Sequence, residues 1–311
     1  MPAHFADRLL AAIAKKGSPC CVGLDPRLDW LPNTLQSRLR LRPTAQSAAS
    51  ALVEFHERIL KRIAPLVPAV KPQLAFFEQL GAPGIEAYEH LVRAAQALGL
   101  LVIADAKRGD IGPTAEAYAR AFFGPLEIQR TRIDICAADA LTVNPFFGSD
   151  GVRPFLDAAR AQRAGLFLLV RTSNPSSAEF QAHPAHSIAL SDLIADRVHE
   201  WGSADIGEEG YSSVGAVVGA THPKLLADLR KRMPRALFLL PGYGAQGGKA
   251  EDVVGAFDER GAGGLIVAAR SVNFAYRAAD GSESADWEGA IEAATARMVT
   301  DVRRALAARP S

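Results

Sequence analysis

Short runs of apolar residues alternate along the chain with longer segments in which apolar residues recur every three or four positions. Continuous apolar runs of this length are typical of buried strands, and the longer period is typical of amphipathic helices. Many of the runs end near a glycine, a proline or a charged side chain, which limits how far each strand extends. The pattern predicts eight strands, over residues 20–25, 69–77, 101–107, 140–146, 165–173, 214–221, 236–240 and 264–270.

Amphipathic segments predict a helix before the first strand and further helices between the later ones. Near the amino terminus Phe5, Leu9 and Ile13 lie four positions apart and are flanked by charged residues. This spacing is typical of an amphipathic helix and not of a signal peptide. The other helices are expected over residues 43–63, 84–98, 116–123, 187–201, 222–233 and 286–308.

One residue and two segments between these elements allow further predictions. Thr114 precedes the predicted helix over residues 116–123 and is a residue type that caps helices. Residues 27–42 are basic and interrupted by proline, so we expect an inserted loop or a short helix there. Residues 280–285 are short and polar, which predicts a surface loop.

Eight strands that alternate with helices predict an α/β fold of the (β/α)8 type, a TIM barrel. We expect a single domain over residues 1–311, with an added amino-terminal helix and inserted loops. A doubly wound open sheet is the alternative, but it would usually have fewer strands or a second domain. No linker rich in glycine, serine or proline divides the chain.

The composition indicates which kinds of binding partner and which cellular compartment to expect. The chain has 311 residues, 49% of them hydrophobic, and a formal net charge of +1. So small a charge gives no long-range field that would favour nucleic acid or an anionic membrane, and no apolar stretch approaches the roughly 20 residues of a membrane span. Cys20, Cys21 and Cys136 have neither zinc-site spacing nor the density of a disulfide framework, so we expect reduced thiols in a cytoplasmic protein.

Polar side chains stand where the predicted strands end. In a barrel these carboxyl ends converge on one mouth, where the chemistry of the fold is placed. On the third strand the period of two places Asp105 and Lys107 on the same face. The simpler interpretations are a surface ion pair, worth about 0–1 kcal/mol, or one buried structural pair. The full set of strand-end candidates is Asp25, Lys71, Asp105, Lys107, Asn144, Ser173, Gln246 and Arg270.

The two last strands indicate an anion site. Residues 241–248 are rich in glycine, so their backbone N–H groups can approach a ligand closely. Arg270 follows the eighth strand and is suited to bidentate contact with phosphate. Because barrels often bind phosphate between the loops after strands seven and eight, the sequence predicts a phosphorylated ligand.

Neither a metal site nor a dinucleotide site is expected. No H-x-x-x-H motif or cysteine cluster is present, and the seven histidines, among them His56, His90 and His222, are scattered over helical stretches where we expect them to be solvated. The spacing of glycines in residues 242–247 only loosely matches a nucleotide fingerprint and lacks the rest of a Rossmann unit.

Residues 105–112, Asp-Ala-Lys-Arg-Gly-Asp-Ile-Gly, resemble the signature of the orotidine 5′-phosphate decarboxylase family in its longer bacterial form. The resemblance implies a homodimeric lyase that converts orotidine 5′-monophosphate (OMP) to uridine 5′-monophosphate (UMP), the last step of pyrimidine biosynthesis, without a cofactor. It extends over nearly the whole chain, through residues 23–26, 70–78, 142–146, 171–175, 241–248 and 269–270.

The resemblance also implies a role for each candidate. Lys107 would protonate C6 of the pyrimidine within a charged network that includes Lys71, Asp105 and an Asp110 from the partner subunit. Two departures, Pro113 and Tyr243, concern loops and not the charged residues. In the substrate-binding set, Asp25 and Lys71 would contact the ribose, Ser173 the pyrimidine, and Gln246 and Arg270 the phosphate, while Asn144 would line the site and Thr114 would reach across the dimer.

Two other functions remain possible from the residues alone. A barrel aldolase could use Lys71 or Lys107 to form a Schiff base, which requires a desolvated lysine with a lowered pKa. Neighbouring carboxylates favour the ammonium form instead. A sugar-phosphate sensor without catalysis could keep the barrel and the anion loop, but it would not need the charges of residues 105–110.

Overall fold

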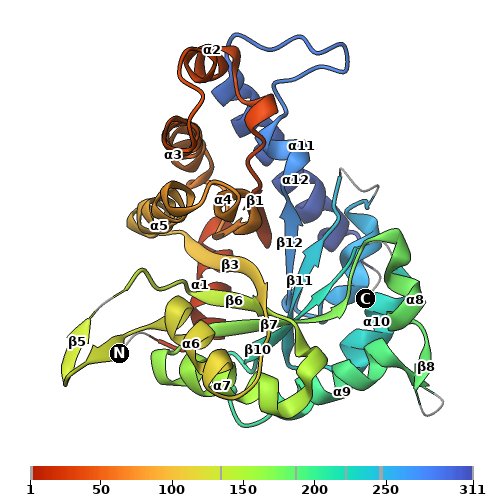
Figure 1. Ribbon diagram of the computed structural model, residues 1–311. Coiled ribbons are helices and arrows are strands. Elements are labelled where there is room, and N and C mark those ends of the chain that lie inside the picture. Colours follow the sequence, from red (N-terminus) through yellow and green to blue (C-terminus); the bar gives the residue numbers. More distant parts are fainter. Residues whose placement is uncertain (1–2, 134, 186–187, 221–222, 245–247, 310–311) are drawn as a thin grey trace.

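The computed structural model, which describes residues 3–133, 135–185, 188–220, 223–244 and 248–309, contains a closed barrel of eight parallel strands (Figure 1). The predicted fold class is therefore confirmed. Around the barrel the strands follow their order in the chain, and the last pairs with the first. They are β1 (Cys20–Leu24), β2 (Ala69–Pro72), β3 (Leu101–Arg108), β6 (Ala140–Val143), β7 (Gly165–Arg171), β10 (Ser212–Val218), β11 (Ala236–Pro241) and β12 (Gly264–Ala268).

Helices cover the outside of the barrel. Most lie where the sequence predicts them, and α7 occupies a segment for which the apolar pattern gave no assignment. Thr44 begins α3 with a capping box, its side chain accepting from Ser47 N–H, and Asp286 accepts from Gly289 N–H at the start of α12. The larger helices are α3 (Ala45–Ile63), α5 (Ala82–Ala97), α6 (Gly112–Phe123), α7 (Gly148–Gln162), α9 (Leu190–Gly202), α10 (Pro223–Arg232) and α12 (Trp287–Ala307).

Six strands were predicted too long, and at three of them a helical turn takes the place of the last predicted residues. β2 ends at Pro72, and Ala75–Glu78 forms the short helix α4, because Phe77 N–H bonds to Leu74 C=O and turns the chain. β6 ends at Val143, followed by the 3-10 helix η2 (Pro145–Phe147). β12 ends at Ala268, and Arg270–Asn273 forms α11. In each case a helical turn at the mouth replaces the last predicted strand residues.

Thr114 is not a helix cap, contrary to the prediction. The helix α6 begins at Gly112 with Ile111 at the capping position, and Pro113 occupies the first turn. Proline is favoured there because its missing N–H has no partner to lose. Thr114 is therefore an exposed residue inside the helix.

Two inserted features surround the barrel. The basic segment after β1 forms a 3-10 turn, η1 (Leu28–Trp30), and α2 (Asn33–Leu41), which agrees with the expected short helix. The hairpin of β4 (Leu126–Ile128) and β5 (Thr131–Ile133) projects from the barrel and was not predicted (Figure 1). Its two strands are exposed and only three residues long, too short for a clear alternating pattern.

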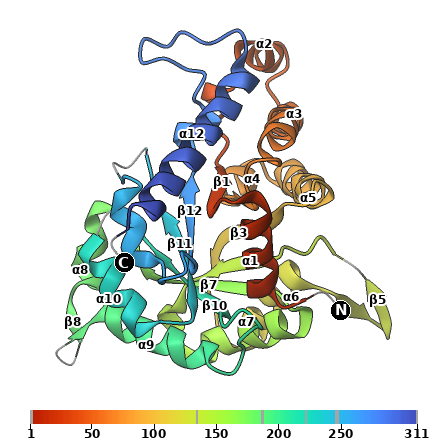
Figure 2. The same ribbon diagram turned by 180° about the vertical axis from the view of Figure 1, so that it is seen from behind.

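The predicted amino-terminal helix, α1 (Phe5–Lys16), closes the amino-terminal end of the barrel (Figure 2). Phe5 packs edge-to-face against Phe167 inside the barrel, with ring centroids 6.0 Å apart. Gly165 makes room for this packing, because a Cβ there would lie 2.2 Å from the Phe5 ring. The strand ends opposite the mouth are thereby shielded from water.

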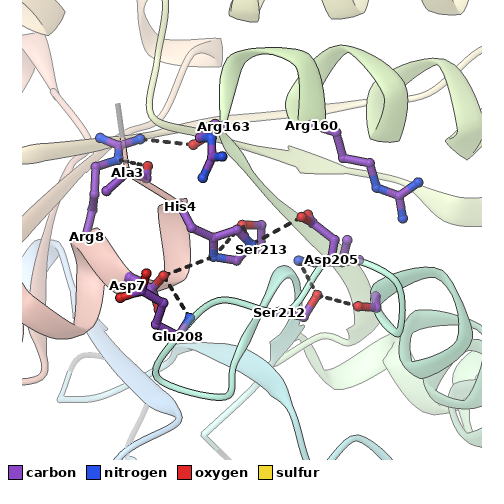
Figure 3. Close-up of polar contacts among 12 residues, drawn as sticks. Ala3, His4, Asp7, Arg8, Arg160, Arg163, Asp205, Glu208, Ser212 and Ser213 are labelled. Carbon is purple, nitrogen blue, oxygen red and sulfur yellow. Dashed lines mark hydrogen bonds and ion pairs between the residues drawn. The ribbon is translucent and has the colours of Figure 1, made fainter. Parts of the chain in front are cut away.

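Polar contacts fix α1 in this position (Figure 3). Asp7 accepts hydrogen bonds from the backbone N–H groups of Glu208 and Glu209, both at 3.0 Å. The His4 ring lies 2.9 Å from the Ser213 hydroxyl, and Arg8 donates to Asp139 at 2.5 Å. The helix is thus attached to three separate parts of the barrel rim.

The barrel interior changes from apolar to polar along each strand. Cys21, Ala69, Ile103 and Ala140 belong to the cluster that packs around α1. Because side chains alternate between faces, residues two or four positions later point into the same interior, nearer the mouth. Those residues are Asp25, Lys71, Asp105 and Thr142.

His56 on α3 is buried, not solvated as predicted. Its ring has no exposed surface and lies against Phe55 and Phe77. One ring nitrogen bonds to Leu52 C=O at 2.9 Å, and the other has no partner among the described residues. Burial lowers the pKa of His56 to about 4, because a charged imidazole would be desolvated there.

We expect the protein to lose stability as the pH falls from about 6.5 to 4 because of His56. An unfolded chain binds a proton on this residue below about 6.5, whereas the folded chain does so only below about 4, so protonation favours unfolding in this window. The loss should reach about 3 kcal/mol at pH 4. Denaturant unfolding of the parent and of His56→Gln across this range checks the difference, with exposed His90→Gln as the control. Equal pH profiles for parent and His56→Gln would contradict the assignment.

Candidate active site

Asp105 is the centre of the polar group at the barrel mouth. It is 5% exposed and accepts hydrogen bonds from four side chains on three strands or their ends. Lys71 and Gln73 bond to one carboxylate oxygen, and Lys107 and Thr142 bond to the other, at 2.5 and 2.9 Å. A buried carboxylate with both oxygens satisfied in this way is fixed in place.

The two lysines differ in their access to solvent. Lys71, from β2, is 6% exposed and forms its ion pair with Asp105 inside the barrel. The Lys107 side chain is 43% exposed and reaches Asp105 from the rim. Lys107 is therefore the more accessible of the two lysines, and it shares a face with Asp105 as predicted.

Lys107 has a left-handed backbone, with φ of +49°. The β3–β6 ladder is irregular between Ala104 and Arg108, and Lys107 N–H bonds to the Thr142 hydroxyl at 3.0 Å instead of a strand carbonyl. A residue with a side chain held in such a conformation costs on the order of 1–3 kcal/mol, which surrounding contacts must offset. The site therefore holds strain at Lys107, the more exposed of its two lysines.

The charges in this network support one another. Burial alone would raise the pKa of Asp105, but the adjacent ammonium groups of Lys71 and Lys107 outweigh it and hold that pKa well below its usual range. Burial would lower the pKa of Lys71, yet Asp105 and Asp25 raise it above its usual range. Lys71 is therefore an ammonium ion, which disfavours its use as a Schiff-base amine.

Asp25 offers an unused acceptor beside this network. One carboxylate oxygen is buried without a hydrogen-bond partner among the described residues. Burial raises the pKa of Asp25, and Lys71 opposes that rise. Asp25 and Lys71 line a pocket of about 180 Å³ that also includes Phe76, Tyr243 and Arg270. A ligand hydroxyl donating to Asp25 would supply the missing partner.

The pocket extends from this network toward the loops after β11 and β12. Arg270 is exposed at the start of α11, lines the same pocket and makes no side-chain hydrogen bond within the described residues. In the glycine loop Gly242 and Gly244 have φ of +112° and +75°, values that side chains disfavour. Gln246 lies outside the described residues. Arg270 and part of the glycine loop, the two parts of the predicted anion site, thus line the same pocket.

Four other predicted residues are not joined to the charged network within one chain. Ser173 follows β7, half-buried, and packs against Gly219. Asn144 accepts from Phe146 N–H at 3.1 Å and so caps η2. Asp110 accepts from the neighbouring Ile111 N–H at 2.8 Å, and Thr114 is exposed on α6.

Gln73 and Thr142 were missed by the sequence analysis. Gln73 is two positions after Lys71 and thus faces the same way, and Thr142 is two positions after the inward-facing Ala140. Both lie in segments that carry the family resemblance, at residues 70–78 and 142–146. The inward period of each strand could have identified them as partners for a buried carboxylate.

The described residues contain no cluster of three or more histidine, cysteine or acidic side chains suited to hold a metal ion. Cys20, Cys21 and Cys136 are all free thiols, and burial raises the pKa of Cys20 to about 12. Within the same residues, no helix is long and apolar enough to cross a bilayer.

Comparison with known proteins identifies close relatives. Residues 18–286 match the family described as "Orotidine 5′-phosphate decarboxylase / HUMPS family". The orotidine 5′-phosphate decarboxylase of Rhodopirellula baltica is 43% identical over 94% of this chain and 97% of its own length, and that of Deinococcus radiodurans is 43% identical over 88% and 91%.

A solved structure agrees with these sequence relatives. The structure of Leishmania donovani OMP decarboxylase superposes with a TM-score of 0.74 and 31% identity over 98% of this chain and all of that one. The match covers the barrel and the segments that carry the charged network. The chain belongs to the orotidine 5′-phosphate decarboxylase family.

Proposed function

We propose that this protein decarboxylates OMP to UMP, the last step of pyrimidine biosynthesis, with Lys107 as the proton donor. The observation that carries the proposal is the alternation of Lys71, Asp105 and Lys107 at the mouth of a barrel of this family. Burying a carboxylate between two ammonium groups costs more free energy than filling the same space with apolar residues. A barrel with a purely structural role would therefore have apolar residues here.

The reaction breaks the bond between C6 of the pyrimidine and its carboxylate carbon. Carbon dioxide leaves, the electron pair remains on C6, and the Lys107 ammonium donates a proton to it; the resulting amine regains a proton from water. Because Lys107 is held by Asp105 before the substrate arrives, its charge stabilises the developing carbanion without reorganisation. We expect no cofactor in this step, since the charged residues supply both the stabilisation and the proton.

Asp105 also acts on the bound substrate. Its carboxylate lies next to Lys107 and would face the departing carboxylate, which raises the energy of the bound ground state. We assign the larger share of the rate enhancement to stabilisation of the transition state, because the two lysines already neutralise the charge of Asp105.

The remaining pocket residues bind the parts of the nucleotide that do not react. Asp25 has a free acceptor for a ribose hydroxyl next to Lys71, and Arg270 with Gln246 binds the phosphate. Ser173 contacts the base, and Asn144 lines the site. Binding energy from the phosphate is realised far from C6 and positions the base against Lys107.

We expect Arg270→Ala to weaken binding of phosphorylated ligands by about 1.5–3 kcal/mol, the usual range for a lost hydrogen bond to a charged group. The guanidinium is exposed in the pocket and pairs with no other side chain in the part of the chain that the structure describes, so its loss should leave the fold intact. Calorimetric titration with UMP and with uridine measures the effect, which should appear for UMP alone. An unchanged UMP affinity would remove Arg270 from the phosphate site.

The proposed enzyme is a cytoplasmic homodimer in which Asp110 and Thr114 act across the interface. Apolar side chains near Asp110 are exposed in the single chain: Ile111 (54%) follows it directly, and Phe147 (50%) lies, like the Asp110 carbonyl, beside Gly151. Exposed apolar residues gathered on one face are typical of a protein interface. The free cysteines support a reducing compartment.

Mixing two inactive variants tests whether Asp110 acts in the partner's site. Lys107→Ala and Asp110→Ala should each lose turnover alone. In a mixed dimer one site has both substitutions and the other has neither, so subunit exchange at equal concentrations should restore roughly a quarter of the parent activity. If Asp110 serves its own chain's site, the mixture remains inactive.

Incubation of the purified, metal-free protein with OMP tests the function itself. Loss of the ultraviolet absorbance band of the substrate is the expected result. If the band persists, borohydride trapping with a sugar phosphate tests the aldolase, and a thermal-shift screen of phosphorylated sugars and nucleotides tests the sensor.

A further inference from the structure

Arg108 follows Lys107 in the chain but lies on the outer side of the barrel. Val102 and Ala104, which precede it by even steps, pack in the cluster between strands and helices. The Arg108 guanidinium forms an ion pair with Glu78 at the end of α4 and lies over the rings of Tyr118 and Phe122 on α6, at 5.5 and 5.8 Å. It is therefore held between two helices while Lys107 points inward.

The ion pair joins the end of β3, just after Lys107, to α4, the helix that follows the strand of Lys71. Glu78 follows β2 and Lys71, and Arg108 ends β3 one residue after Lys107. The β2–β3 ladder pairs only residues 69–70 with 101–102, followed by a single bridge between Gln73 and Asp105. Leu74 N–H also donates to Asp105 C=O at 3.2 Å. Apart from these backbone contacts, the Asp105 side chain links β3 to Lys71 inside the barrel, and Arg108 links β3 to Glu78 on the outside.

Lys107 needs such support because its backbone is left-handed. A lysine relaxes from φ of +49° toward extended values unless its neighbours prevent it. On the following residue, Arg108 C=O accepts from Asn144 N–H at 2.8 Å, and the guanidinium is fixed by Glu78. Because the carbonyl and the guanidinium of Arg108 are both held, rotation of the Lys107 backbone toward extended values is opposed.

We propose that Arg108 and Glu78 are positioning residues that hold Lys107 in its left-handed conformation, with its ammonium group on Asp105. The proposal rests on the proposed function in taking Lys107 as the proton donor. An ordinary surface pair would give small, general effects on stability. A positioning pair would instead affect turnover, since a shift of about 1 Å at a reacting group can cost on the order of 100-fold in rate.

Three variants separate these roles. Arg108→Met keeps the length and the contact with the rings of α6 but removes the charge, and Glu78→Gln removes the partner. Arg108→Lys restores a charge that can reach Glu78 and should recover part of the loss. The matched control is Arg38→Met with Glu54→Gln, an exposed ion pair between α2 and α3 at 2.7 Å.

Arg108→Met and Glu78→Gln should each lower kcat by about 10- to 100-fold. UMP affinity should stay within about twofold, and the fall in melting temperature should resemble that of the control pair. The double variant should be no slower than the worse single one, because both changes release the same backbone. An unchanged kcat, or losses in kcat and UMP affinity of equal size, would overturn the proposal.

A second measurement does not depend on activity. In protein labelled on lysine with carbon-13, the Lys107 Cα resonance, assigned with Lys107→Arg, reports its backbone conformation. It should move toward the extended range in Arg108→Met and stay in place in Arg38→Met. A resonance that does not move overturns the proposal, even if the parent decarboxylates OMP. Failure of the parent to act on OMP, with the resonance moving as expected, would count against the proposed function alone.

Discussion

Replacing Lys107 with alanine should lower turnover of OMP by at least about 10⁴-fold while UMP still binds. Two contributions to the rate are lost together. Proton donation contributes a factor of about 10²–10⁴, and stabilisation of charge in the transition state contributes a factor of about 10²–10³. UMP carries no charge at C6, so its affinity depends on the ribose and phosphate contacts, which remain. The substrate absorbance assay measures turnover, and calorimetric titration measures the UMP affinity.

The matched control for this variant is Lys231→Ala, which removes a lysine whose side chain is 81% exposed and should leave both quantities unchanged. Because the Lys107 side chain is itself 43% exposed, its loss should not unfold the protein. Turnover of Lys107→Ala within tenfold of the parent would be incompatible with Lys107 as proton donor.

Asp105→Asn should be the most damaging change to the fold and the site together. The carboxylate is the partner of both ammonium groups, and its loss leaves the buried Lys71 next to Lys107 without an anion between them. Removing one partner from a buried pair typically costs about 3–5 kcal/mol. Turnover should fall as well, because Lys107 no longer has a fixed position.

Denaturant unfolding at pH 7 measures the loss of stability in Asp105→Asn, and the control is Asp29→Asn, whose side chain is 62% exposed in its pair with Arg27. The destabilisation should shrink at high pH, because burial favours loss of the proton from Lys71 once Asp105 no longer opposes it, and the uncompensated charge then disappears. A variant as stable as the parent at neutral pH would mean that Asp105 does not compensate the buried charge of Lys71.

The barrel was predictable because its strands are buried on both faces and are therefore continuously apolar. Where an apolar run passes into a helix, that signal fails. Residues 74–77 are apolar in α4 just as they would be in a strand, so β2 was extended to Phe77. The strand stops because the chain turns into α4, where Phe77 N–H bonds to Leu74 C=O, and the apolar pattern does not report that turn.

The charged network was predictable for a different reason. A period of two places Asp105 with Lys107, and the convergence of strand ends adds Lys71 and Asp25. The left-handed backbone of Lys107 was not predictable, because it depends on contacts with Thr142 and Arg108 that no local pattern reports. His56 was misassigned, because its burial is decided by α3 packing against Phe77, far from it in the chain.

Because β1 pairs with β12, the barrel can close only after the last strand has been synthesised. Cys20 pairs with Ile266, so one edge of the first barrel strand has no partner until the last one has been synthesised. At about 5–20 residues per second, a ribosome needs on the order of 10 s or more to cover that distance. The lysines on β2 and β3 emerge early, but Asp25 and Arg270 come together only when the ring closes. A nascent chain therefore carries the charges of Lys71, Asp105 and Lys107 well before Asp25 and Arg270 complete the pocket at the mouth of the barrel.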